Sequence, residues 1–311
     1  MRLKPLPPPS SELLLFPESD TEYIHFEDAH DHPFDEAARR FSPVNAWWLA
    51  DAALLAYWDE GEARPIWNRA GLRFEFLSNE GVQCHVGCAD GFVVVAFRGT
   101  QPNDWHDLFD IAEVDHVAWE LGGSVHAGFR SALDRIWPDL EKTLKRLDPT
   151  GRKTWFTGHS LGGALATLSM DRLGTARGLY TIGSPPVGNR RFARQFDARH
   201  QGRCFRYVNH RDIVVYAARW LALLVGNFTH VKERRYINAQ GAISDASLSF
   251  ADGLSLLGAR KAAPQGTGGL EAARLVHLPG FLIDHTPRRY AVHIWNDYAS
   301  GAPRPIAAAG N

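Results

Sequence analysis

The sequence has little of what an extracellular disulfide scaffold or a membrane protein needs. It contains three cysteines in 311 residues, and Cys84 and Cys88 lie four residues apart in a predicted strand, roughly 13 Å from each other and too far for a disulfide. Prolines occupy the N-terminal stretch MRLKPLPPPSSELLLF, where a signal peptide needs an apolar run. These absences predict a reducing compartment, and the expected location is the cytoplasm, with unconventional export as the alternative.

The chain has neither a large net charge nor a long apolar run. There are 34 Lys and Arg against 35 Asp and Glu, so the basic surface of a nucleic-acid-binding protein is not expected. The longest apolar run, 220–225, is too short to cross a bilayer, so no transmembrane segment is expected. The His- and acid-rich stretch 25–32 is interpreted as a solvated loop, because ligands crowded in one loop rarely complete a tetrahedral metal site. We expect no metal and no cofactor.

What is present centres on residues 154–168, with the sequence TWFTGHSLGGALATL. A short apolar strand leads into a G-x-S-x-G pattern around Ser160, and a helix rich in small residues follows. The pattern alone is weak, because it arises by chance in roughly one chain in ten of this length. In a strand–turn–helix setting, however, such a turn exposes the serine hydroxyl, and the N–H groups at the start of the helix can stabilise an oxyanion at the same place.

The remaining pattern predicts an α/β architecture. Three strands at 72–77, 82–88 and 92–97, joined by short turns, form an antiparallel meander. Later strands near 154–158, 179–183 and 203–208 alternate with helices, which implies a largely parallel sheet with helices on both faces.

Other segments are assigned by their composition. Residues 1–33 are expected to form an irregular arm, 34–298 a single domain and 299–311 a flexible tail. A hairpin is expected from 228–231 and 234–237. The segment 108–124 is interpreted as a surface excursion that could cover a pocket, with a plain connection as the alternative.

A serine nucleophile needs a base and an orienting carboxylate. Asp212 directly follows a predicted sheet strand and is favoured as the acid. His285 lies just before a predicted helix and is favoured as the base, although His277 also lies in a loop and remains a rival. The weaker alternatives are Asp197, Asp245 and Asp252 for the acid, and His230 and His293 for the base.

Two backbone N–H groups are expected to meet the oxyanion. One belongs to Leu161, directly after the serine, and the other to Thr100, in a polar turn at the tip of the predicted central strand. Arg98, at the start of that turn, is expected to anchor it.

Seven blocks occur in the order of a known family, and with them the chain resembles the class 3 lipases. The blocks are VVVAFRGT (93–100), DWHDL (104–108), VHAGF (125–129), FTGHSLGGALA (156–166), YTIGSPPVGN (180–189), RYVNHRDIVV (206–215) and DHTPRRY (284–290). The resemblance implies an α/β-hydrolase fold, a Ser160–Asp212–His285 triad, an oxyanion hole at Thr100 and Leu161, and a lid after the oxyanion turn. It also favours His285 over His277, because the family histidine follows an aspartate.

The resulting hypothesis is a serine carboxylic-ester hydrolase that cleaves acylglycerols or related acyl esters through an acyl-enzyme. Its expected partners are a small-molecule or lipid ester substrate and a transient lipid interface. The alternatives are an acyltransferase and a non-catalytic interaction module on the same fold. The secretion signal and disulfides of the fungal lipases are missing from the sequence, which again indicates an intracellular protein.

Overall fold

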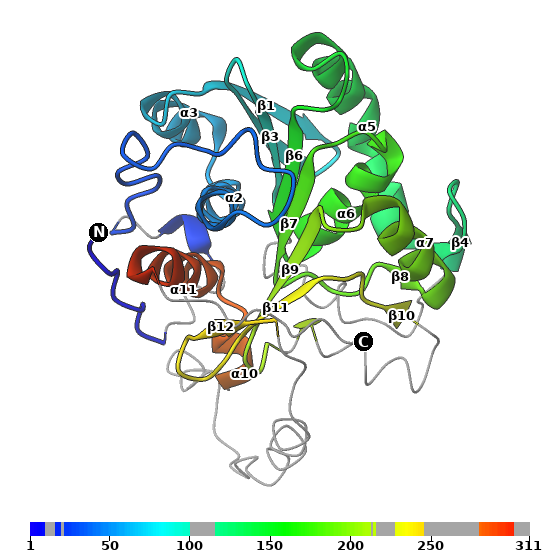
Figure 1. Cartoon of the computed structure of the whole chain (residues 1–311). Helices are drawn as coiled ribbons and strands as arrows, with labels where there is room; N and C mark the ends of the chain where they lie inside the picture. Colours follow the sequence, from blue (N-terminus) through cyan, green and yellow to red (C-terminus); the bar gives the residue numbers. More distant parts are fainter. Residues whose placement is uncertain are drawn as a thin grey trace, which may run out of the picture.

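The computed structural model describes residues 1–9, 16–19, 22–99, 116–212, 214–215, 228–245 and 280–301. Helices and strands alternate in the middle of the chain, over residues 127–209 (Figure 1). The helices are η1 (Pro17–Ser19), α2 (Pro43–Leu55), α3 (Glu60–Arg69), α5 (Ala127–Leu147), α6 (Leu161–Leu173), α7 (Arg190–His200), α10 (Gly280–Ile283) and α11 (Pro287–Ser300). The strands are β1 (Arg73–Asn79), β2 (Val82–Cys88), β3 (Val93–Phe97), β4 (His116–Ala118), β5 (Ser124–His126), β6 (Thr154–His159), β7 (Gly178–Ile182), β8 (Gly188–Asn189), β9 (Cys204–Asn209), β10 (Phe228–Thr229), β11 (Arg234–Ile237) and β12 (Ile243–Ser244).

The main sheet has the strand order β1-β2-β3-β6-β7-β9-β11-β12. The first three strands pair antiparallel, and β3, β6, β7, β9 and β11 run parallel to one another. This confirms the predicted fold class, a mostly parallel central sheet with an antiparallel N-terminal meander.

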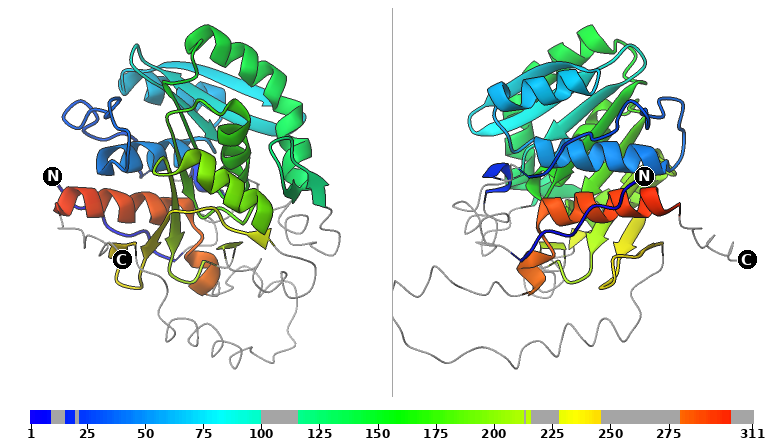
Figure 2. Two further views of the ribbon diagram at one scale, coloured as in Figure 1. Left: turned by 45° about the vertical axis from the view of Figure 1, so that its right-hand side comes forward. Right: turned by 90° about the vertical axis from the view of Figure 1, so that its left-hand side faces the viewer.

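Strand β3 shows why its sequence is apolar throughout. Val94 and Ala96 pack into the core on one face of the sheet, and Val93, Val95 and Phe97 pack into the core on the other. A strand covered on both faces needs apolar residues at every position, whereas a half-exposed strand alternates. Helices α2, α3 and α11 cover the first face and α5, α6 and α7 the second, as Figures 1 and 2 show.

Helix α2 is buried on all sides. Every residue from Asn45 to Leu55 is buried, because the sheet covers one side and α11 and the preceding chain cover the other. The rings of Trp47 and Trp295 of α11 are 4.7 Å apart, and Phe34 packs against Trp48. A helix that is covered on all sides has no solvent-exposed face, so its sequence is predominantly apolar.

The described part of the N-terminal arm consists of turns and the short helix η1, and it packs closely against the domain. The backbone of Lys4 exchanges hydrogen bonds with the side chain of Asn296, and the indole of Trp295 donates to the carbonyl of Arg2. Tyr23 and Phe26 are buried in the core beside α2. The arm therefore runs beside α11, as Figure 2 shows.

Strands β10, β8, β5 and β4 form a second, antiparallel sheet. The predicted hairpin of 228–231 with 234–237 is therefore wrong: β10 pairs with β8, whereas β11 pairs with β9 in the main sheet. Two adjacent apolar runs look like a hairpin in sequence, but each finds a longer-range partner.

The predicted surface excursion 108–124 is described only from His116 onward. Its second half is an anchored hairpin, because β4 pairs with β5 and Trp119 is buried. The part of the expected lid before His116 lies outside the described residues.

Candidate active site

Ser160 occupies a sharp turn between β6 and α6. Its φ is 55° and its ψ is −126°, a conformation that residues other than glycine rarely adopt. The flanking glycines allow the turn, since a Cβ on Gly162 would overlap the carbonyl oxygen of Phe97 and one on Gly158 would overlap the backbone of Gly162. The predicted strand–turn–helix geometry around Ser160 is therefore present, with the end of β3 packed directly on it.

The hydroxyl of Ser160 is available for chemistry. Its Oγ is buried, and the residues that the structure describes offer it no hydrogen-bond partner. Its backbone N–H donates to the carbonyl of Ile182, 3.0 Å away, which ties the turn to β7. Leu161 is the first residue of α6, and the first amides of a helix have no intrahelical acceptor, so they can donate to an anion at this point.

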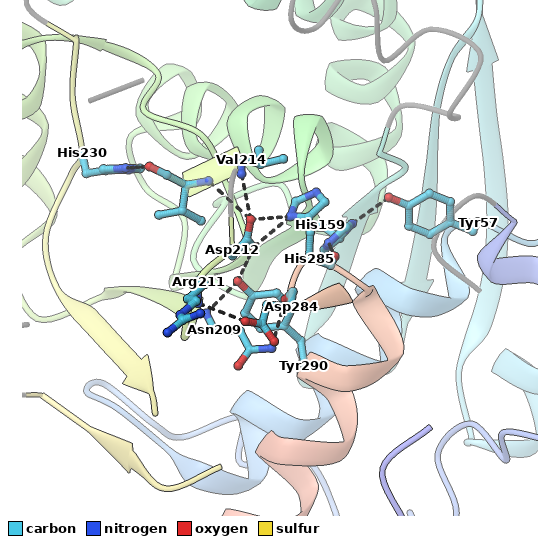
Figure 3. Close-up of polar contacts among 11 residues, drawn as sticks. Tyr57, His159, Asn209, Arg211, Asp212, Val214, His230, Asp284, His285 and Tyr290 are labelled. Atoms are coloured by element: carbon cyan, nitrogen blue, oxygen red, sulfur yellow. Dashed lines mark hydrogen bonds and ion pairs between the residues drawn. The ribbon is translucent and has the colours of Figure 1, made fainter. Parts of the chain in front are cut away.

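His285 and Asp212 form a buried pair (Figure 3). The Nδ1 atom of His285 lies 2.8 Å and 2.9 Å from the two carboxylate oxygens of Asp212, and both side chains are fully buried. Asp212 follows β9 and His285 lies between α10 and α11, so two segments far apart in sequence converge at one end of the sheet.

The carboxylate of Asp212 has further partners. It accepts hydrogen bonds from the backbone N–H of Val214 at 2.9 Å and from the hydroxyl of Tyr290 at 2.6 Å. The same hydroxyl oxygen accepts from the backbone N–H of Asn209 at 2.8 Å. A buried carboxylate is tolerated only when its oxygens are satisfied, and these bonds also fix its orientation toward His285.

The loop after β7 brings this pair toward the serine turn. A Cβ on Gly183 would lie 2.9 Å from a carboxylate oxygen of Asp212 and 3.2 Å from Cε1 of His285. Any side chain at Gly183 would therefore displace the pair. His159, the neighbour of Ser160, has its ring 4.4 Å from that of His285, so the serine turn and the histidine loop are in direct contact.

The rival residues lie elsewhere or have other partners. Asp197, on α7, accepts from the backbone N–H of Lys232, and Asp245 pairs with Arg235. His230 faces the carbonyl of Val215 at 3.0 Å, and burial lowers its pKa. Burial lowers the pKa of His293, on α11, to about 4. Asp252 and His277 lie outside the described residues.

Thr100 also lies outside the described residues, so its predicted part in the oxyanion hole stays a prediction. The residues before it are described and are held firmly. The backbone N–H of Arg98 donates to the carbonyl of Gln83 at 3.0 Å, and its guanidinium donates to the side chain of Gln83 at 2.6 Å. Arg98 thus ties the start of the turn to β2.

Sequence reasoning missed several residues that surround the pair. Tyr290 lies in the DHTPRRY block, but its contact with Asp212 depends on the way α11 packs. Asp284 accepts from the backbone N–H of Arg211 at 3.1 Å, and burial raises its pKa. His159 was visible only as the variable residue of the G-x-S-x-G pattern. Position in a motif block was the only available signal for these residues.

The parallel sheet, the meander before it and the serine turn at the end of a central strand are features of the α/β-hydrolase fold. Residues 94–220 match the family model described as "Lipase (class 3)". The secreted mono- and diacylglycerol lipase 1 of Fusarium solani is 37% identical over 129 residues, which cover 39% of this chain and 37% of that protein. The phospholipase A1-II 1 of Oryza sativa subsp. indica is 29% identical over 198 residues, or 53% of this chain and 48% of that protein.

Among solved structures, that of Rhizomucor miehei triacylglyceride lipase superposes with a TM-score of 0.51 at 23% identity. The match covers 63% of this chain and 80% of that one. At this identity the likeness shows the fold alone. The chain spans less than half the length of the two curated relatives above, so its activity and substrates are a matter for proposal.

The expectation of a cytoplasmic protein is contradicted by the relatives. The Fusarium solani lipase is named as secreted, which points away from the cytoplasm. The expectation rested on three cysteines, which are all buried and free, and on the absence of a recognisable leader. Buried thiols act as small apolar side chains and do not report the compartment.

Proposed function

We propose that the protein is a serine carboxylic-ester hydrolase that cleaves acylglycerols or related acyl esters, with Ser160, His285 and Asp212 as its triad. The observation that carries the proposal is the convergence of a buried serine hydroxyl at a strained turn, without a hydrogen-bond partner among the described residues, with a buried His285–Asp212 pair. The relatives add support, since their names denote lipases of mono- and diacylglycerols and a phospholipase.

In this proposal Oγ of Ser160 attacks the ester carbonyl while Nε2 of His285 takes its proton. Asp212 holds Nδ1 of His285 and so leaves Nε2 facing the reaction. The N–H of Leu161 at the start of α6, with that of Thr100, stabilises the oxyanion. His285 then protonates the leaving alcohol, and water, activated in the same way, releases the acid and restores the serine.

The first test is hydrolysis of a nitrophenyl-ester chain-length series by the purified protein, combined with labelling by a fluorophosphonate. We expect turnover of at least some chain lengths and a single phosphonylated peptide that contains Ser160. Absence of hydrolysis across the series, or labelling at another residue, would contradict the proposal. Product analysis with an added alcohol separates hydrolysis from acyl transfer. No specific feature of the described residues favours acyl transfer.

We also propose transient contact with a lipid surface. Among the described residues, large apolar side chains are exposed along the N-terminal arm, namely Met1, Leu3, Leu6, Phe16 and Ile24, which are 43 to 63% exposed. Such side chains can insert into the boundary of a lipid layer. None of the helices described is long and apolar enough to cross a membrane.

Activity on a short-chain triacylglycerol should therefore rise when the substrate exceeds its solubility limit. The double substitution Leu3→Ser and Leu6→Ser should reduce this rise without changing the rate on dissolved substrate, because both side chains lie on the exposed arm. Rates measured below and above the solubility limit check this. Equal rates on the two sides of the limit would make the protein an esterase of dissolved substrates.

A further inference from the structure

A second buried histidine lies beside His285. His159 ends β6 directly before Ser160 and is 2% exposed. Its Nε2 lies 2.8 Å from the backbone carbonyl oxygen of His285, and its Nδ1 lies 2.8 Å from the hydroxyl of Tyr57 (Figure 3). Tyr57 follows the C-terminal end of α2 and is itself buried. The three residues thus form a continuous chain of hydrogen bonds.

The chemistry of these groups fixes the direction of both bonds. A carbonyl oxygen only accepts, so Nε2 of His159 carries the proton. Burial, with the nearby His285, lowers the pKa of His159 well below its ordinary value, so the ring is neutral and has only one N–H. Its Nδ1 must then accept from Tyr57. Burial also raises the pKa of Tyr57, so its hydroxyl keeps the proton that it donates.

Tyr57 also touches the turn that leads to Thr100. A Cβ on Gly99 would overlap the hydroxyl oxygen of Tyr57 and would lie 2.8 Å from the carbonyl oxygen of His159. The absence of a side chain at Gly99 therefore lets the tyrosine hydroxyl rest on the backbone of the turn. One hydroxyl thus contacts both the serine turn and the backbone that precedes the predicted oxyanion donor.

We propose that Tyr57 and His159 are positioning residues that hold the backbone of His285 and the Gly99 turn at fixed positions relative to Ser160. The proposal rests on the ester-hydrolase function proposed above. The backbone N–H of His285, in the connection between α10 and α11, donates to the carbonyl of Leu282, and the hydrogen bond from His159 to the carbonyl of His285 links this connection to the serine turn. A displacement of about 1 Å between catalytic groups can lower the rate by about 100-fold.

The kinetics of three variants test this chain of hydrogen bonds. His159→Phe keeps a ring but removes both hydrogen bonds, and we expect kcat to fall by about 100-fold. KM should stay near that of the wild type, because neither residue is placed against the substrate. His159→Gln, whose amide can donate to His285 and accept from Tyr57, should recover most of kcat. Tyr57→Phe leaves the hydrogen bond from His159 to His285 in place. Its kcat should therefore lie between the values of His159→Phe and His159→Gln.

Thr157→Val is the matched control. The hydroxyl of Thr157 donates to the carbonyl of Leu49 at 2.9 Å, so this substitution also removes a buried hydrogen bond that ties β6 to the α2 segment. It does not touch His285, and its kcat should stay near that of the wild type. Equal losses in Thr157→Val and His159→Phe, or no recovery in His159→Gln, would overturn the positioning role.

A measurement that does not depend on activity separates this inference from the proposed function. In ¹⁵N spectra of histidine-labelled protein, His159 is identified as the signals missing from His159→Gln. We expect a neutral ring with the proton on Nε2 at every point between about pH 5 and 8, where an ordinary imidazole changes its charge. If His159 titrates in this range, or carries its proton on Nδ1, the proposed hydrogen bonds from Tyr57 to His159 and from His159 to His285 are wrong. A protein without esterase activity would instead count against the proposed function.

Discussion

Ser160→Ala should lower kcat for a nitrophenyl ester by about six orders of magnitude. Without Oγ no acyl-enzyme can form on Ser160, whose side chain occupies the strained turn between β6 and α6. The removal of one small side chain at a position already shaped by its glycines should leave the fold intact. Steady-state kinetics on the purified variant, with a circular dichroism spectrum to confirm folding, measure this loss.

The same mechanism predicts how losses combine. His285→Ala should cost about as much as Ser160→Ala, and the double variant should be no slower than either single one, because residues that act as a unit do not contribute additively. Asp212→Asn should cost about four orders of magnitude, since it disturbs the tautomer of His285 while it preserves shape.

The discarded candidates supply the controls for these variants. Asp197→Asn and His293→Gln replace one of the alternative acids and one of the alternative bases, which have other neighbours, and both should keep kcat near the wild-type value. A fully active Ser160→Ala, or single losses that add up in the double variant, would contradict a shared catalytic step.

Much of the fold was predictable because its signals are local. The apolar run of β3 indicated a strand covered on both faces, and the small residues after Ser160 supported a helix directly after the serine turn. The predicted hairpin failed because strand partners are a matter of long-range competition: β11 joins β9 in the parallel sheet, a pairing that no local pattern of residues 228–237 reveals.

The candidate site was predictable only in part, for a similar reason. A turn such as that of Ser160 is encoded in five consecutive residues, whereas Tyr290, one of the partners of Asp212, comes from α11, 78 positions later in the chain. Tyr57 could not be found from sequence, because nothing in its surroundings distinguishes it from a core tyrosine. Only the packing of α2 on β6 brings its hydroxyl to His159.

Asp171 shows how the rear of the serine helix is held. It lies near the C-terminal end of α6 and is fully buried. Its carboxylate accepts hydrogen bonds from the indole of Trp119 at 2.7 Å, from two nitrogens of Arg199 at 2.9 and 2.8 Å, and from Nε2 of His200 at 2.8 Å. This one side chain therefore joins α6, the end of α7 and the β4–β5 hairpin.

Asp171→Ala should lower the free energy of unfolding by about 3 to 5 kcal/mol, because it leaves buried donors and a guanidinium without their acceptor. The upper part of the range is less favoured, since the side chain of Arg199 is 32% exposed and keeps some solvation. Asp134→Asn is the control: it removes a half-exposed partner of Arg172, and such surface pairs contribute about 0 to 1 kcal/mol. Urea unfolding of the three proteins measures both values, and equal stability of the two variants would refute the assignment.

The pH dependence of stability tests the same carboxylate independently. Burial alone would raise the pKa of Asp171, but the hydrogen bonds from His200, Arg199 and Trp119 outweigh burial and lower the pKa below its ordinary 3.8. A group whose pKa is lower in the folded state stabilises the fold above the unfolded value, and this contribution is lost as the pH falls through the folded value. The wild type should therefore lose stability more steeply than Asp171→Ala below about pH 4. Parallel curves of stability against pH would mean that Asp171 has the same proton affinity in the folded and unfolded states. The hydrogen bonds to Asp171 would then not be what stabilises the C-terminal end of α6.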